Sequence, residues 1–135
     1  MRLPVLCLLA SAAWAQTGLA GPMEVIRYGQ WEGILATQRP NIAVVDLWAS
    51  WCVSCIERFP EMVAMAERYA GRDVRFLTLN LDDPQDRAGI DWANEFLQEI
   101  GADFPNYHLA ENLTWSFEQL DLLAIPVVLI YDGQG

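Results

Sequence analysis

The segment Ile42–Trp48 restricts the possible folds of this chain more than any other feature. It is a continuous apolar run, IAVVDLW, interrupted by a single acid, Asp46. Such runs are typical of central strands that are buried on both faces of a sheet, so helices must cover the sheet on both sides. Similar apolar runs predict further strands over Val74–Asn80 and Val127–Tyr131.

Helical patterns separate these strands. We expect helices over residues 23–38, 53–69, 88–100 and 113–120, and an extended segment over residues 104–109. Pro60 lies inside the second of these helices and should kink it. The alternation of helices with buried strands predicts an α/β fold in which a central sheet is covered on both faces.

Composition limits the classes of partner. The 135 residues suffice for one domain, and 53% of them are hydrophobic. The 18 acidic residues outnumber 8 basic ones, all of which are Arg, and the net charge is −10. A surface of this sign repels nucleic acid and anionic lipid headgroups, which excludes nucleic-acid binding.

The N-terminus has the pattern of a targeting segment. Arg2 supplies a positive charge, residues 3–13 are mostly apolar, and residues 13–15 read Ala-Trp-Ala. This is the pattern of a secretory signal peptide, and its apolar run is too short to span a bilayer. We therefore expect a signal peptide over residues 1–15, a linker over 16–22 and one domain over 23–135. The mature protein should be exported to the periplasm without inserting into the membrane.

Two cysteines remain after cleavage before Gln16, and they lie three positions apart as Cys52 and Cys55. At a junction from strand to helix, Cys52 would lie at the helix N-terminus, where the helix dipole stabilises a thiolate. Cys55 would lie one turn later and be more buried. This spacing predicts that Cys52 attacks a disulfide and that Cys55 resolves the mixed disulfide.

Two inert roles for the pair are less consistent with the sequence. Structural zinc needs about four ligands, and the mature chain adds only His108 to the two cysteines. A purely structural disulfide between residues so close in sequence would close too short a loop to stabilise the fold much.

The residues around the pair resemble a known family. Residues 44–55, VVDLWASWCVSC, together with Pro60, resemble the active-site stretch of the thioredoxin superfamily. The segment Ala124-Ile125-Pro126-Val127 is similar to the cis-proline segment of that superfamily. The signal peptide and the long stretch between Asn80 and Ile125 look like the TlpA/ResA group of exported members.

The resemblance implies a thioredoxin-like three-layer α/β/α sandwich with a mixed central sheet. It implies a cis peptide bond before Pro126, with Trp51, Ile125 and Pro126 contacting the substrate. Thioredoxin-like domains carry one more strand and a terminal helix after the cis-proline strand. The chain stops at Gly135, so we expect it to be incomplete at the C-terminus and to lack both.

Asp46 matches the buried acid that thioredoxins use to take a proton from the resolving cysteine, and burial would raise its pKa. The alternative is an acid at the end of a strand that points to water. TlpA/ResA proteins often carry a Glu three residues after the second cysteine, where this chain has Arg58. The resemblance therefore leaves Asp46 as the acid. Trp48 is expected to be a packing residue, and His108 is expected on the surface.

We thus expect a periplasmic thiol-disulfide oxidoreductase that needs no cofactor besides its redox-active disulfide. No basic residue lies between the cysteines to stabilise the thiolate strongly, which favours a reductant. The resemblance implies that its clients are exported proteins with disulfides or cysteine pairs, including apocytochromes in cytochrome c maturation and copper-site proteins. It also implies an upstream thiol electron donor, which could be membrane-bound.

Alternative functions remain open. The two thiolates could instead bind Cu(I), which favours soft ligands, and Met62 and Met65 lie on the same predicted helix. The chain could also be an inactive fragment of a thioredoxin-like protein. A peroxidase would need a Pro-x-x-x-Thr-x-x-Cys motif, which is absent from the sequence.

Overall fold

The computed structural model describes residues 21–134 as one five-stranded sheet with four helices. The predicted signal peptide and residues 16–20 of the predicted linker lie outside the described residues. The strand order is β1-β4-β3-β2-β5, and β5 runs antiparallel to β2 while the other neighbouring strands pair in parallel. The elements are β1 (Glu24–Ile26), α1 (Tyr28–Gln38), β2 (Ile42–Trp48), α2 (Val53–Arg68), β3 (Val74–Asn80), α3 (Arg87–Glu99), β4 (Asn106–Leu109), α4 (Leu113–Gln119) and β5 (Val127–Tyr131).

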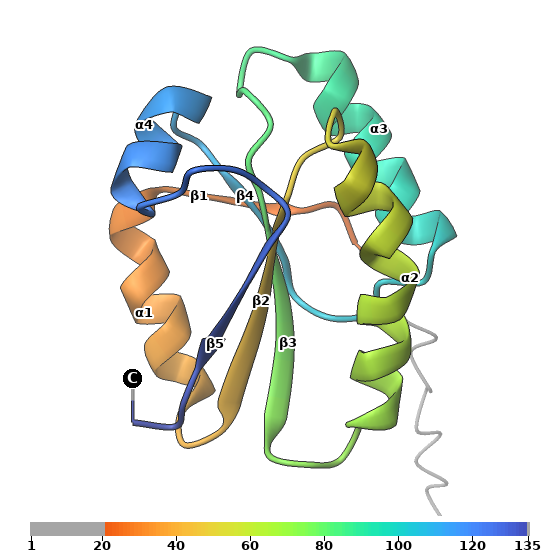
Figure 1. The fold of residues 1–135 in the computed structure, drawn as a ribbon, viewed down its shortest axis with the longest axis vertical. Coiled ribbons are helices and arrows are strands. Elements are labelled where there is room, and N and C mark those ends of the chain that lie inside the picture. Colours follow the sequence, from red (N-terminus) through yellow and green to blue (C-terminus); the bar gives the residue numbers. More distant parts are fainter. Residues whose placement is uncertain (1–20, 135) are drawn as a thin grey trace, which may run out of the picture.

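The helices form two layers on opposite faces of this sheet. Helices α1 and α4 cover one face, and α2 and α3 cover the other (Figure 1). The mixed sheet between two helical layers confirms the predicted thioredoxin-like sandwich. Strands β2 and β3 lie side by side at its centre and pair along their whole length, from Ile42↔Val74 to Trp48↔Asn80.

The three long strands have the predicted bounds, and the ends of α2, α3 and α4 differ from the prediction by one residue. The helix predicted over residues 23–38 is wrong in its first part, because residues 24–26 form β1 beside β4. The spacing of Ile26 and Trp31 suggested one helix. Both side chains are buried in the same core cluster, but from two different elements. A strand of three residues carries no periodicity of its own and depends on β4 for its hydrogen bonds.

Each face of the sheet has its own core. Beneath α1 and α4, the cluster is made of aliphatic side chains from the strands together with Trp31. Beneath α2 and α3, Trp48 packs edge-on against Phe59 and lies near Phe96, in the cluster that also contains both cysteines. Trp48 is thus the buried packing residue that the sequence predicts.

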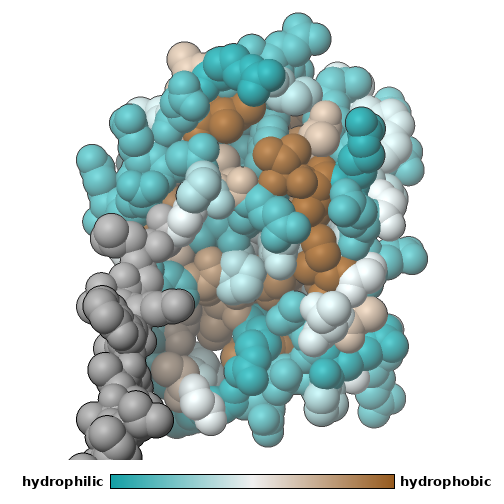
Figure 2. All heavy atoms as spheres, turned by 180° about the vertical axis from the view of Figure 1, so that it is seen from behind, coloured by the Kyte–Doolittle hydropathy of each residue, from teal (hydrophilic) through white to brown (hydrophobic). Residues whose placement is uncertain are grey.

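The back of the molecule shows hydrophobic side chains gathered in the middle of the face, with hydrophilic ones around them (Figure 2). Within residues 21–134, none of the helices has the length and apolar character needed to cross a membrane.

Candidate active site

The two cysteines form a disulfide at the start of α2. Cys52 is the N-cap residue of the helix, and its sulfur accepts a hydrogen bond from the Cys55 backbone N–H at 3.3 Å. Cys52 is 6% exposed, whereas Cys55 is fully buried. A sulfur at the N-cap lies where the unpaired N–H groups and the helix dipole favour negative charge. The geometry therefore assigns the more accessible and more easily ionised position to Cys52.

Exposed apolar side chains flank the disulfide. Trp51 and Val53, which adjoin Cys52 in the chain, are 51% and 70% exposed. A pocket of about 460 Å³ begins at Trp51 and runs along α4, where Leu113, Phe117 and Leu122 line it. Large apolar side chains that remain in water beside a reactive group are typical of a surface that contacts a partner.

The segment before β5 adjoins the same site. The Ile125–Pro126 peptide bond is cis, in agreement with the expectation for Pro126. Ile125 packs against the cluster that contains both cysteines. Leu123, just before this segment, is completely exposed. The fold thus brings Ile125, which is far away in sequence, to the end of the sheet that carries Trp51 and the cysteines.

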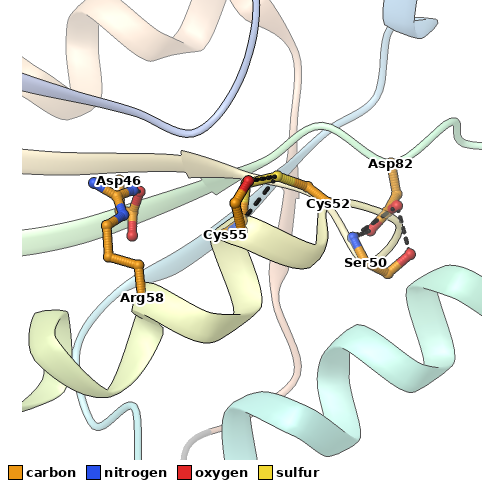
Figure 3. The surroundings of a disulfide bond; sticks show 7 residues. Asp46, Ser50, Cys52, Cys55, Arg58 and Asp82 are labelled. Carbon is orange, nitrogen blue, oxygen red and sulfur yellow. Dashed lines mark hydrogen bonds and ion pairs between the residues drawn. A yellow bond between two sulfur atoms is a disulfide. The ribbon is translucent and has the colours of Figure 1, made fainter.

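Asp46 is buried in β2, with 1% of its side chain exposed, so it does not point to water. Arg58 on α2 forms an ion pair with it, and the two side chains lie on the side of Cys55 that is away from Cys52 (Figure 3). Burial raises the pKa of Asp46 to about 6, although the charge and hydrogen bond of Arg58 act in the opposite direction. Its other oxygen, Oδ2, has no hydrogen-bond partner among the described residues. Asp46 can therefore exchange a proton near neutral pH.

The role of Arg58 was not predicted from the sequence. This residue is a departure from the TlpA/ResA pattern, whereas the structure pairs it with the buried acid. A signal was present, because Cys55 and Arg58 are three residues apart and so lie on the same face of α2. Since Cys55 faces the sheet, Arg58 is able to reach β2.

A second polar group lies on the other side of Cys52. Ser50 donates from its backbone N–H and its hydroxyl to the buried carboxylate of Asp82, and both residues lie close to Cys52 (Figure 3). No motif in the sequence singles out Asp82 as a functional residue. The signal available was its position just after a buried strand, at the sheet end where the cysteine pair also begins.

The expectation that His108 lies on the surface is wrong, because its side chain is only 2% exposed. It lies on β4 beside Asn80 of β3, and its Nδ1 is 2.9 Å from the Asn80 side-chain oxygen. Burial lowers the pKa of His108, so the ring is neutral at neutral pH. A polar residue with this partner is stable in the interior, and the pairing is visible only in the folded sheet.

The described residues contain no group of three or more His, Cys, Asp or Glu side chains that could hold a metal ion. Met62, which the copper-binding alternative needs near the cysteines, is a buried core residue of α2.

Comparison with known proteins identifies the family. The thioredoxin family model matches residues 23–91. A thiol:disulfide interchange protein DsbE from Allochromatium vinosum is 30% identical over an alignment of 71 residues, with a coverage of 38% of this chain and 39% of that protein.

Solved structures agree with this assignment. A Chlorobium tepidum protein named for the thiol:disulfide interchange protein DsbE is 25% identical with a TM-score of 0.61, over 75% of this chain and 67% of that one. A Bacteroides vulgatus protein named for a thiol-disulfide oxidoreductase is 26% identical with a TM-score of 0.57, over 73% of this chain and 65% of that one. The family match, the fold and the cysteine pair at the start of α2 together show that this chain belongs to the thioredoxin family.

Proposed function

We propose that this protein is a thiol-disulfide oxidoreductase that works through Cys52 and Cys55. The observation that carries the proposal is the disulfide at the N-terminus of α2, in which Cys52 is slightly exposed and Cys55 is fully buried. The DsbE names of two relatives support the same activity. The Cys52–Cys55 disulfide itself is the redox group, and the reaction calls for no further cofactor.

In the reducing direction, the Cys52 thiolate attacks one sulfur of a client disulfide. A mixed disulfide forms, and the other client sulfur leaves as a thiolate. Cys55 then loses its proton and attacks the Cys52 sulfur. The bond between Cys52 and the client breaks, and the second client sulfur leaves as a thiolate. The products are the Cys52–Cys55 disulfide and a client dithiol, so two electrons pass to the client, while Cys55 supplies one proton and the solvent supplies the other.

Asp46 is proposed to act as the general base that accepts the proton of Cys55. With a pKa of about 6, it is mostly ionised at pH 7 and can accept this proton, then release it to the departing client thiolate. Arg58 keeps part of the population ionised despite burial, because its cation stabilises the carboxylate. The pair thus provides a base with a working range near neutral pH.

The client is proposed to bind across Trp51, Ile125 and Pro126. The half-exposed Trp51, the pocket beside α4 and the exposed Leu123 together provide an apolar surface next to Cys52. An extended client segment could pair with the backbone beside Pro126 while its apolar side chains cover this surface. Glu118 and Asp121 also line the pocket, so basic residues in the client would be favoured there.

We further propose that the protein acts as a reductant after export to the periplasm. The signal-peptide pattern of residues 1–15 and the DsbE-named relatives support export. Its clients would be exported proteins with cysteine pairs, including apocytochromes, and a thiol donor would reduce it again.

The test compares the wild type with Cys52→Ser and Cys55→Ser in the reduction of a peptide that contains one disulfide. We expect Cys52→Ser to lower the rate to the uncatalysed background. Cys55→Ser should accumulate a mixed disulfide on Cys52, which mass spectrometry detects. Equal rates for the wild type and Cys52→Ser would refute the enzymatic proposal. Stoichiometric Cu(I) binding without disulfide reduction would favour a copper-binding protein instead.

A further inference from the structure

A buried carboxylate lies beside the turn that leads to Cys52. Asp82 follows β3 by two residues, and its side chain has no exposed surface. Its two oxygens accept hydrogen bonds from the Ser50 N–H at 3.0 and 3.1 Å, from the Ser50 hydroxyl at 2.7 Å and from the Asn80 amide at 2.7 Å. All of these partners are donors, which is the environment that an ionised carboxylate requires.

Two further buried side chains hold this carboxylate in place. The Asn80 oxygen accepts from the Asp82 backbone N–H at 3.1 Å and lies 2.9 Å from His108 Nδ1. Because an amide oxygen only accepts, the His108 Nδ1 must donate, and the orientation of the Asn80 amide is defined on both sides. The series His108, Asn80, Asp82 and Ser50 therefore connects β4, at one side of β3, to the redox turn.

Asp82 forms no ion pair with any of the described residues. Among residues 21–134, no Arg or His nitrogen lies within 4.0 Å of its oxygens. The carboxylate is instead solvated by neutral donors. A buried charge retained without a counterion is costly unless it has a function or is fully hydrogen-bonded.

We propose that Asp82 is a positioning residue for the redox pair, which holds the Ser50 turn and places a negative charge beside the helix end where the Cys52 thiolate forms. Ser50 precedes the N-cap Cys52 by only two residues. The dipole of α2 stabilises the thiolate at this end, and the Asp82 charge opposes it. A less stable thiolate makes the dithiol less stable relative to the disulfide, so the pair becomes a stronger reductant.

This inference rests on the proposed exchange activity and adds a reason for its direction. The other ionisable groups described in this part of the molecule lie on several elements. They are Asp83 and Asp86 before α3, Arg87 in its first turn, the neutral His108 on β4, Glu118 and Asp121 in the pocket with Trp51, and the Asp46–Arg58 pair. The experiment therefore changes one charge at a time.

The principal experiment compares Asp82→Asn with Asp83→Asn, a matched change at the next residue, which is partly exposed and accepts from the Gln85 N–H. In the reduced protein, Cys52 is alkylated with iodoacetamide over a range of pH, while the buried Cys55 is protected. We expect the pH of half-maximal alkylation to fall by about half a unit to one unit in Asp82→Asn. The disulfide fraction at a fixed glutathione ratio should fall several-fold, and Asp83→Asn should match the wild type.

Ser50→Ala separates the charge from the shape of the turn. This variant keeps the carboxylate but removes one donor, so the charge is less compensated and the alkylation midpoint should rise. A fall in both variants would mean that loosening of the turn governs Cys52, and it would overturn the proposal. Unchanged midpoints and glutathione equilibria in Asp82→Asn would also overturn it. If Asp82→Asn does not fold, Ser50→Ala decides, because a rise supports the proposal and any other result refutes it.

These measurements need only the protein and small thiols. If the alkylation midpoint shifts as expected in Asp82→Asn but the wild type does not reduce peptide disulfides, the Asp82 inference is supported and the proposed enzymatic function is refuted. Full peptide reduction with no shift in Asp82→Asn would refute only the role of Asp82.

Discussion

The two faces of the sheet differ in chemistry although the same strands build both. Toward α1 and α4, the strands present buried aliphatic side chains, among them Leu47 and Leu79. Toward α2 and α3, the alternate positions of the same strands carry buried polar residues. These polar residues are Asp46, Thr78, Asn80, Asn106 and His108.

This difference shows how the molecule divides its tasks. Buried polar groups cost free energy unless they are hydrogen-bonded. Here Thr78 bonds Asn106 across strands at 2.7 Å, Asn80 bonds His108 in the same way, and Asp46 pairs with Arg58 on α2. All of them lie on the face that carries the disulfide. The aliphatic side chains mainly stabilise the fold. The buried polar side chains on the other face lower the stability of the fold, and they support the redox site. The following predictions test this division on each face separately.

The largest expected effect is on the aliphatic face. Leu47 is fully buried, so Leu47→Ala should lower the free energy of unfolding by about 2–5 kcal/mol through lost burial and a cavity. Denaturant unfolding measures this loss, and the Cys52–Cys55 reduction potential should stay at the wild-type value. A shifted potential in the folded variant would show that the two faces are not independent.

Asp46 is adjacent to Leu47 but faces the other side of the sheet, and its replacement should raise the free energy of unfolding at pH 7, where Leu47→Ala lowers it. Its pKa in the folded protein, about 6, lies above the ordinary value of 3.8, so the folded state binds the proton more tightly than the unfolded state. Stability from the protonated acid is present below pH 4 and is lost as the pH rises to about 6, with a total near 3 kcal/mol. Asp46→Asn should remove this dependence, raise stability at pH 7 and slow disulfide exchange.

Denaturant unfolding between pH 4 and 8 checks the prediction for Asp46, with Asp73→Asn as a control because Asp73 is exposed. The pH dependence of the wild type is compared with that of Asp73→Asn. If the free energy of unfolding of the wild type rose between pH 4 and 6, the assignment of a raised pKa to Asp46 would be contradicted.

Arg58→Gln tests the partner of the buried acid. Without the cation, the pKa of Asp46 should rise further, because Arg58 now counteracts the effect of burial. The pH midpoint for resolution of a Cys52 mixed disulfide should move upward by about one unit. Arg68→Gln, on the exposed last turn of the same helix, provides the control. Equal shifts in both variants would indicate a general effect of net charge.

Thr78→Val should have the smallest effect. It removes the hydrogen bond to Asn106 on the polar face, away from the cysteines, and should cost about 1 kcal/mol. The alkylation midpoint of Cys52 should not change. If this midpoint moved as far as in Asp82→Asn, the whole polar face, and not Asp82 in particular, would tune the cysteine.

Much of the fold could be predicted from local patterns. The runs at Ile42–Trp48, Val74–Asn80 and Val127–Tyr131 identified the long strands because burial on both faces leaves a continuous apolar signal. The short β1 could not be found in this way, since its three residues are stabilised by pairing with β4.

Some residues of the candidate site could also be predicted from local sequence patterns, and others could not. Cys52 and Cys55 are neighbours in the chain, and their spacing alone indicates a redox pair. Asp46 was noticeable as the one acid in an apolar strand. The partners of these residues come from other elements, such as Asp82, which lies 32 positions after Ser50. No local pattern encodes such a contact, because either residue by itself is compatible with a solvated turn.

The sequence by itself determined the alternation of helices and strands, the position of the cysteine pair at the start of a helix and the acidic charge of the chain. These properties follow from side-chain periodicity, spacing and composition, which act over a few residues. Only the tertiary structure decided that Arg58 pairs with Asp46, that Asp82 accepts hydrogen bonds from Ser50 and that His108 is buried. The charge and hydrogen bonds around a buried group depend on which distant residues the folded sheet brings within about 3 Å of it.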